Sequence, residues 1–104
     1  MKKFIILIPV YNDWKSVFEL LENIDVQIKN WDAEVLVLIV NDASTEEQPK
    51  TELDFKNIKS LQVINMKQNK GHARCIAAGL KYIYEKKDFD HVIPMDGDGE
   101  DRPA

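Results

Sequence analysis

Four carboxylates lie within six consecutive residues near the end of the sequence, and this cluster has the clearest potential for chemistry. They are Asp96, Asp98, Glu100 and Asp101. Carboxylates packed so closely repel one another unless a proton or a cation lies among them. Oxygen ligands favour Mg²⁺ or Mn²⁺, and a sparse carboxylate site suits a metal that also binds substrate phosphates. The alternatives are a solvated acidic turn and a calcium loop, although the full EF-hand pattern is missing.

Two further side chains have the chemistry to recognise a nucleotide base. Asp42 follows the most apolar run of the chain. Its carboxylate could accept a hydrogen bond from uracil N3–H or guanine N1–H, or it could cap a turn, as could Ser44. Tyr11 could stack on a base or pack over the edge of a sheet. The residue types alone leave both pairs of alternatives open.

A short turn at residues 69–72 precedes a run with helical periodicity. Lys70 and His72 in this turn, with Arg74 just beyond it, could bind phosphate at the N-terminus of that helix. The turn has neither the Walker pattern nor the full Gly-x-Gly-x-x-Gly pattern. A surface position for His72 is an equally good interpretation, and Cys75 is interpreted as unreactive.

The elements that position these residues can be predicted from hydrophobic patterning. Apolar runs predict strands at residues 3–8, 34–40, 61–66 and 91–95, and the first two are continuously apolar, as in a parallel sheet covered on both faces. Apolar residues at helical spacing predict helices at about 14–28 and 71–87. Polar residues at 41–60 predict a loop with at most one helical turn. This order predicts an α/β, Rossmann-like half-domain with a mainly parallel sheet flanked by helices.

Every predicted strand is followed by polar or charged residues. Because ligands bind beyond the carboxyl ends of the strands in such sheets, the four sets of residues are expected to meet at one edge. They lie at residues 9–12, 41–44, 69–72 and 96–101. One polar strand end is unremarkable, whereas four together predict a ligand cleft.

Composition excludes several other classes of protein. The chain has 104 residues, of which 44% are hydrophobic and 31% are charged, and its net charge of −4 does not suit a nucleic-acid-binding protein. No apolar run approaches the roughly 18 residues of a transmembrane helix. Cys75 is the single cysteine and cannot form an internal disulfide, which favours a reducing, cytoplasmic compartment.

In their order and spacing, the strand ends resemble the motifs of family 2 glycosyltransferases, which have a GT-A fold. The matching segments are residues 9–12, 40–44, 69–72 with 79–80, and 95–103. The resemblance spans the chain and implies transfer of a sugar from a nucleoside diphosphate sugar, with UDP favoured over GDP and with Mg²⁺ or Mn²⁺ as cofactor. It predicts that residues 1–104 form the nucleotide-sugar-binding portion, truncated before the acceptor-binding half.

The resemblance also implies roles for individual residues. Tyr11 and Asp42 flank the base, Asp98 holds the metal that bridges the diphosphate, and Asp96 faces the ribose or the sugar. Pro9 and Val10 form the floor of the pocket. The residues expected to bind the donor are Pro9, Val10, Tyr11, Asn12, Asp42, Lys70, His72, Arg74 and Asp96. The residues expected to bind the metal are Asp96, Asp98 and Glu100.

The sequence departs from the family pattern at four positions. Asn41 stands where many relatives carry Asp, and Ala43 replaces a frequent Gly. His72 occupies a position that is often Lys, so a phosphate contact there would depend on pH. Pro94 removes a backbone donor from the fourth predicted strand, which predicts a bulge or an edge position.

The resemblance sets expectations for the whole protein. The catalytic base is expected beyond Ala104, the acceptor is a lipid or a polysaccharide, and the full-length protein acts in the cytoplasm or at the inner membrane face. We expect this chain alone to bind the donor weakly and to lack turnover. An exposed sheet edge could pair two copies of the chain.

Two other α/β modules are alternatives. Nucleotidyltransferase-like domains usually carry a Gly-rich basic loop after the first strand, and residues 11–13 do not form one. Receiver-like domains place an acidic pair after the first strand, whereas the acidic cluster here follows the fourth. Both differences favour the glycosyltransferase interpretation.

Overall fold

The structure is a computed structural model that describes residues 2–45, 55–86 and 88–95, without the side chain of His72. Within these residues it contains β1 (Lys2–Val10), α1 (Trp14–Gln27), β2 (Ala33–Asn41), β3 (Ile58–Asn65), α2 (His72–Lys86) and β4 (His91–Pro94). The acidic cluster at residues 96–101 lies outside the described residues.

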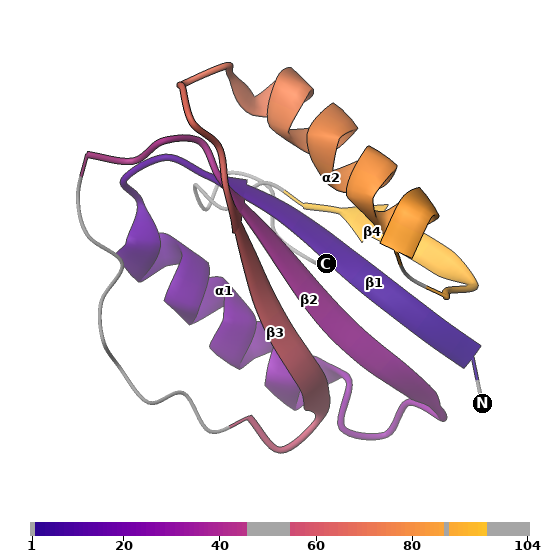
Figure 1. Cartoon of the computed structure of the whole chain (residues 1–104). Helices are drawn as coiled ribbons and strands as arrows, with labels where there is room; N and C mark the ends of the chain where they lie inside the picture. Colours follow the sequence, from indigo (N-terminus) through magenta and orange to yellow (C-terminus); the bar gives the residue numbers. More distant parts are fainter. Residues whose placement is uncertain (1, 46–54, 87, 96–104) are drawn as a thin grey trace.

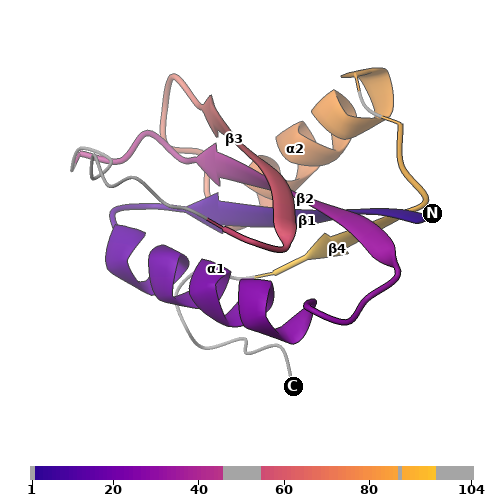
Figure 2. The same cartoon turned by 90° about the horizontal axis from the view of Figure 1, so that it is seen from below.

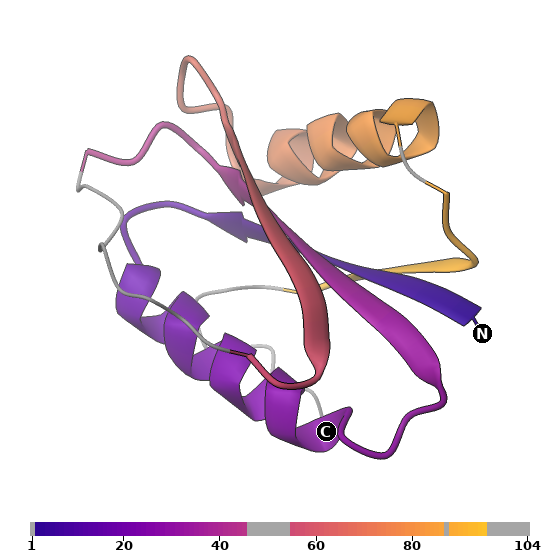
Figure 3. The ribbon, with the colours of Figure 1, turned by 60° about the horizontal axis from the view of Figure 1, so that its bottom comes forward.

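The strands form one parallel sheet in the order β3-β2-β1-β4. The chain passes from β1 through α1 to β2 on one side, and α2 carries it from β3 back across the sheet to β4 (Figure 1). The two helices therefore cover opposite faces of the sheet, as Figures 2 and 3 show. This arrangement confirms the predicted α/β, Rossmann-like fold and places the change of strand order between β1 and β4.

Continuous apolar runs in β1 and β2 are explained by the two helices. Side chains of a strand alternate between the faces of its sheet, so a strand covered on both sides must be apolar at every position. Ile6 and Ile39 pack in the α1-side core. Leu7 and Val40 pack in the α2-side core with Ile83. All five side chains are fully buried.

Gly79 brings α2 into close contact with the sheet. A Cβ atom at this position would lie 2.4 Å from Leu7 Cδ1 and 3.1 Å from Val40 Cγ2. Any larger side chain would have to displace α2 or the strand residues beneath it. The glycine thus fixes the height of α2, and with it the position of the loop that enters this helix.

β3 begins three residues earlier than the sequence pattern predicted. The strand starts at Ile58, inside the segment predicted to be a loop, and it pairs in parallel with β2. The register shifts between Val35 and Leu36, which breaks the periodicity by which a strand is recognised. The loop prediction was therefore wrong for residues 58–60, and residues 46–54 of that segment lie outside the described residues.

A carboxylate in α1 anchors the start of β3. Asp25 accepts backbone hydrogen bonds from Asn57 and Ile58, both at 2.8 Å, and from Lys56 at 3.2 Å. The side-chain amide of Asn57 donates in return to the Asp25 carbonyl at 2.6 Å. Burial alone would raise the pKa of Asp25, but the three backbone donors lower it below its ordinary value.

Two prolines occur in strands without costing hydrogen bonds to a neighbour. The N–H of Met95 donates to the Leu7 carbonyl at 2.9 Å, so the nitrogen of Pro94 faces away from β1, at the outer side of β4. Among the described strands β4 therefore lies at an edge, as predicted. The nitrogen of Pro9 faces the β4 side, beyond the last β1–β4 pair of Leu7 with Pro94.

Candidate functional site

The loops after β1, β2 and β3 gather at the carboxyl edge of the sheet (Figure 1). Each contains one residue with a left-handed backbone: Asn12 at φ 61°, Ala43 at φ 57° and Gly71 at φ 87°. This conformation is free of strain for glycine and costs energy for residues with a side chain. Asn12 and Ala43 are the non-glycine residues with positive φ in the described part of the chain. Strain of this kind is common at functional sites.

A chain of hydrogen bonds joins these loops. The backbone N–H of Asn12 donates to Ser44 Oγ at 2.9 Å, and the Ser44 hydroxyl donates to Asn41 Oδ1 at 2.5 Å. The Asn41 amide then donates to Asn65 Oδ1 at 3.0 Å. A side branch runs from the Asn12 amide to Thr45 Oγ1 at 2.9 Å. Residues from the ends of β1, β2 and β3 are thereby held as one unit.

Asp42 is fully buried within this edge, with 1% of its surface exposed. Its two carboxylate oxygens accept the backbone N–H groups of Lys70, at 2.7 Å, and Gly71, at 2.9 Å. The Asn69 side chain also donates to the Asp42 carbonyl at 3.3 Å. The geometry thus fits the turn-capping alternative. A base could reach this carboxylate only if the loop moved, so base recognition by Asp42 stays a prediction.

The phosphate-binding prediction for the start of α2 changes for the same reason. The helix begins at His72, and the carboxylate of Asp42 lies beside the two residues that precede it. An internal anion therefore already occupies the place where a phosphate would benefit from the helix dipole. The side chains of Lys70 and Arg74 are exposed on this edge. Their positive charges can attract a phosphate even though Asp42 occupies the start of the helix.

Cys75 lies one turn into α2 and faces Asp42. Burial, the hydrogen bond to the carboxylate of Asp42 and its negative charge raise the pKa of this thiol to about 12. The thiol is therefore protonated and unreactive at neutral pH. This agrees with the interpretation of Cys75 as a structural residue.

At the end of β1, only part of the predicted donor-binding set faces solvent. Pro9 and Val10 are buried strand residues, and Val10 packs in the α1-side core. Tyr11 has 41% of its surface exposed, and Asn12 is half-buried. The edge therefore offers an aromatic ring and an amide to a ligand, above a floor of β1 residues.

The predicted metal ligands lie just beyond β4, outside the described residues. They are Asp96, Asp98 and Glu100. The Met95–Leu7 hydrogen bond holds the last described residue before them next to β1, on the side opposite β2. The described residues contain no group of three or more His, Cys, Asp or Glu side chains that could hold a metal. The metal site thus stays a prediction.

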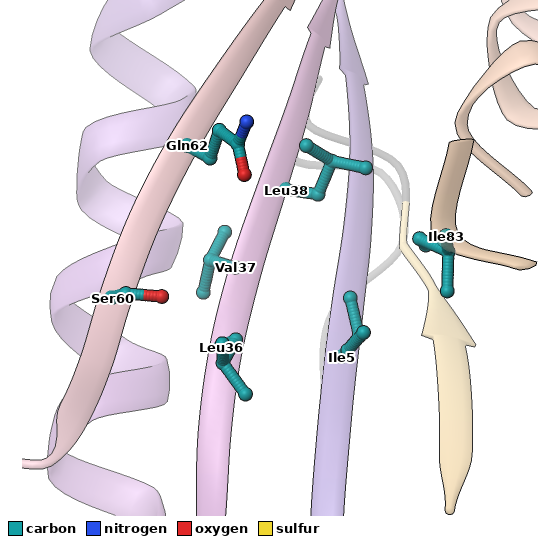
Figure 4. A pocket seen from close by; sticks show the side chains of 7 residues that line it. All are labelled: Ile5, Leu36, Val37, Leu38, Ser60, Gln62 and Ile83. Atoms are coloured by element: carbon teal, nitrogen blue, oxygen red, sulfur yellow. The ribbon is translucent and has the colours of Figure 1, made fainter. Parts of the chain in front are cut away.

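A hollow lies away from this edge, on the sheet (Figure 4). It is lined by Ile5, Leu36, Val37, Leu38, Ser60, Gln62 and Ile83. Gln62 donates to the Tyr82 hydroxyl at 2.6 Å, which ties β3 to α2 beside the hollow. Its mostly apolar lining and its position in the middle of the strands do not suit a nucleotide.

Sequence analysis missed two features of the site. Asn41 links β3 to the loop after β2. In the sequence it was noted only as a departure from the family pattern. Asn65 was not singled out, although it accepts the Asn41 amide. An amide at each of two adjacent strand ends was the available signal, and it becomes informative only once β2 and β3 are known to pair.

Comparisons with known proteins agree with this architecture. The profile of glycosyl transferase family 2 matches residues 5–104. An undecaprenyl-phosphate 4-deoxy-4-formamido-L-arabinose transferase of Proteus mirabilis is 30% identical over 105 residues, which cover 99% of this chain and 31% of that protein. The chain therefore spans less than a third of this relative.

A solved structure shares the fold. The mannosyltransferase PcManGT from Pyrobaculum calidifontis, in complex with GDP-Man and Mn²⁺, superposes with a TM-score of 0.65 at 20% sequence identity. The match covers 93% of this chain and 28% of that one. Because the family profile extends over residues 5–104, nearly the entire sequence, the chain belongs to glycosyl transferase family 2.

Proposed function

We propose that this chain forms the donor-binding part of a glycosyltransferase that transfers a sugar from a nucleoside diphosphate sugar. The observation that carries the proposal is the hydrogen-bonded unit formed by the ends of β1, β2 and β3. It lies at the carboxyl edge, where the strand order changes and where ligands bind in α/β sheets. The Asp-x-Asp segment, residues 96–98, directly follows Met95 in the sequence, and β4 runs parallel to β1 toward this edge.

In this proposal each group at the edge has a distinct task. Tyr11 stacks on the base, because its ring is exposed beside the end of β1. Lys70 and Arg74 supply positive charge toward the diphosphate, with His72 as a further contact when it is protonated. Asp42 acts indirectly by fixing the loop before α2.

The divalent metal is assigned to the segment after β4. Asp98 and Asp96, assisted by Glu100, provide the hard carboxylate oxygens that Mg²⁺ and Mn²⁺ prefer. When bound there, the metal supplies Lewis-acid stabilisation of the leaving diphosphate. The presence of Mn²⁺ and GDP-Man in the mannosyltransferase structure supports the use of a divalent metal.

The acceptor and the setting of the whole protein follow from its relatives. The Proteus relative is named for a lipid-phosphate acceptor, and we propose a lipid-linked acceptor at the cytoplasmic face of the membrane. No described helix is long and apolar enough to span a membrane. We further propose that a free sheet edge allows two copies to pair, and a strictly monomeric chain in light scattering at high concentration would contradict that pairing.

Calorimetric titration with UDP, GDP and CDP, each with and without Mn²⁺, tests the proposed function. We expect metal-dependent binding of UDP, with GDP as the alternative result. Asp98→Ala should weaken it at least tenfold. Glu22→Ala is the matched control, because Glu22 is an exposed carboxylate on α1. Equal, metal-independent binding of nucleotide by the unmodified chain, Asp98→Ala and Glu22→Ala would contradict the proposal. A failure of the unmodified chain to bind any of the nucleotides would also contradict it.

The chain is expected to bind a donor without turning it over, because its catalytic base is assigned to a later segment of the family sequence. Sugar transfer or donor hydrolysis by the isolated chain would contradict this part of the proposal. The measurement is release of UDP or GDP from the corresponding nucleotide sugar, followed over hours in the presence of Mn²⁺.

A further inference from the structure

Ser44 joins the loops after β1 and β2, together with the bond from the Asn12 amide to Thr45 Oγ1. Its hydroxyl oxygen accepts the backbone N–H of Asn12 and its hydroxyl hydrogen is donated to Asn41 Oδ1. We propose that Ser44 is a positioning residue of the donor site, which holds Tyr11 and Asn12 in their binding conformation. The inference rests on the proposed function, because it assigns Tyr11 to the base.

The Ser44 hydroxyl suits this role because it donates and accepts at the same time. Asn41 Oδ1 is an acceptor and needs a donor, while the Asn12 N–H is a donor and needs an acceptor. The direction of the relay is set by two backbone N–H groups, because the Asn12 N–H donates to Ser44 Oγ and the Ser44 N–H donates to Asn41 Oδ1 at 3.1 Å. Threonine can keep the two hydrogen bonds of the hydroxyl, whereas alanine removes both and keeps only the backbone contact with Asn41.

Ser44 helps to select one backbone conformation at Asn12. Asn12 has φ 61°, in the left-handed region, which asparagine tolerates better than most residues but which still has to be selected from the other conformations open to it. The hydrogen bond to Ser44 Oγ is one of the interactions that hold this conformation. Tyr11 is adjacent, so the direction of its exposed ring follows the backbone at Asn12.

Loss of the hydroxyl should therefore change the population of the binding-competent loop. The apparent Kd rises as the reciprocal of the competent fraction, even when every contact to the ligand is retained. One hydrogen bond of this kind biases such an equilibrium roughly three- to tenfold. We expect Ser44→Ala to weaken nucleotide binding by about that factor.

The experiment compares Ser44→Ala and Ser44→Thr with the unmodified chain. Ser60→Ala is the matched control, because Ser60 is an exposed serine on β3 near the amino end of the sheet. Calorimetry gives the Kd for UDP and GDP with Mn²⁺, and separately the Kd for pyrophosphate with Mn²⁺. Ser44→Ala should weaken nucleotide binding about three- to tenfold and leave pyrophosphate binding unchanged. Ser44→Thr should restore most of the affinity.

Three results would overturn the proposal: unchanged nucleotide affinity in Ser44→Ala, an equal loss for pyrophosphate, or an equal loss in Ser60→Ala. Hydrogen exchange of the Asn12 backbone amide tests the role of Ser44 without any nucleotide, so its result does not depend on the proposed function. If the unmodified chain binds no nucleotide, the proposed function fails. Faster exchange at Asn12 in Ser44→Ala would then still support the holding role of Ser44, and unchanged exchange would overturn it.

Discussion

At the carboxyl end of the sheet, side-chain hydrogen bonds link the loops after β1, β2 and β3 into one unit, whereas at the amino end aromatic packing accompanies separate polar contacts at the starts of β1 and β3. Phe4 lies at the centre of the amino end. Its ring contacts Trp31, with 5.5 Å between the ring centroids, and stacks on His91 at 5.0 Å. Exposed ion pairs, such as Lys59 with Glu34, complete this end.

The two ends also differ in backbone strain. The left-handed residues in the described part of the chain are Asn12, Ala43 and Gly71, and each belongs to a carboxyl-end loop. Ala43 is the one of these three that the conformation clearly disfavours, because glycine and asparagine tolerate it, and a fold that served only its own stability would gain by relaxing Ala43. A strained residue in a loop that side-chain hydrogen bonds hold in place is typical of a site that must keep one shape for a ligand. The difference between the ends therefore supports assigning function to the carboxyl end.

The largest expected effect comes from removing Asp42. In Asp42→Ala the N–H groups of Lys70 and Gly71 lose a charged acceptor in a buried position. Because hydrogen bonds to charged groups contribute roughly 1.5–3 kcal/mol each, we expect a loss of about 3 kcal/mol in the free energy of unfolding. Urea denaturation measures this change. Asp42→Asn, which keeps one acceptor oxygen, should lose less, and a loss below about 1 kcal/mol in Asp42→Ala would contradict the capping role.

A smaller effect is expected from the Asp25 anchor at the amino end of β3. Asp25→Ala removes three acceptor contacts at a half-buried site, and we expect a loss of about 1–2 kcal/mol at pH 7. Urea denaturation measures this loss. Nucleotide affinity should stay unchanged in Asp25→Ala, because Asp25 anchors the start of β3 and lies at the end of the sheet opposite Tyr11 and Ser44.

The same anchor makes stability depend on pH. The pKa of Asp25 in the folded chain is lowered from its ordinary value of 3.8. Its stabilising contribution is therefore fully present above that value and is lost as the pH falls through the lower, folded-state pKa. Urea denaturation at pH 7 and at acid pH should show the unmodified chain losing more stability than Asp25→Asn. Parallel losses in both proteins would contradict this account.

Ala43→Gly tests the strain at the carboxyl end with a still smaller change. A left-handed alanine costs roughly 1–2 kcal/mol, and glycine would remove this cost. Part of that gain is lost because glycine has greater conformational freedom in the unfolded chain. We expect Ala43→Gly to be more stable by about 0.5 kcal/mol in thermal or urea unfolding. Destabilisation by Ala43→Gly would show that the φ of 57° at this residue is not a source of strain.

The smallest effect is expected at the exposed ion pair of the amino end. Lys59 and Glu34 lie on the surface, and the pairing with Lys59 lowers the pKa of Glu34. Exposed pairs contribute little because water and salt screen them. Lys59→Ala should leave the urea midpoint within experimental error. A loss comparable to that of Asp25→Ala would mean that this exposed ion pair contributes as much stability as the Asp25 anchor.

The fold could be predicted from sequence because its main signals are local. Continuous apolar runs at residues 4–8 and 35–40 indicate strands covered on both faces, and the structure places them in the centre of a parallel sheet. Apolar residues at helical spacing likewise predicted α1 and α2 to within a residue or two of their ends. Strand alternation and helical periodicity act over a few residues, so they are visible in the sequence.

The site was harder to predict because its contacts join distant residues. Asp42 was identified as a candidate, but its partners Lys70 and Gly71 lie 28 and 29 residues away. Asn41 and Asn65 are separated by 24 residues and meet only because β2 and β3 pair in register. Residue types indicated which side chains have the chemistry, whereas strand order decided which of them face a ligand and which support the loops.

Nuclear magnetic resonance with Mn²⁺ tests the central claim most directly, because the paramagnetic ion broadens signals of nearby residues. We predict that Mn²⁺ together with UDP or GDP broadens the backbone amides of Asn12, Ser44 and Gly71, at the carboxyl end. The amides of Phe4, Trp31 and His91, at the amino end, should keep their line widths, and Asp98→Ala should abolish the broadening. Broadening centred on the amino end, or spread evenly over both ends, would contradict the assignment of the nucleotide-sugar site.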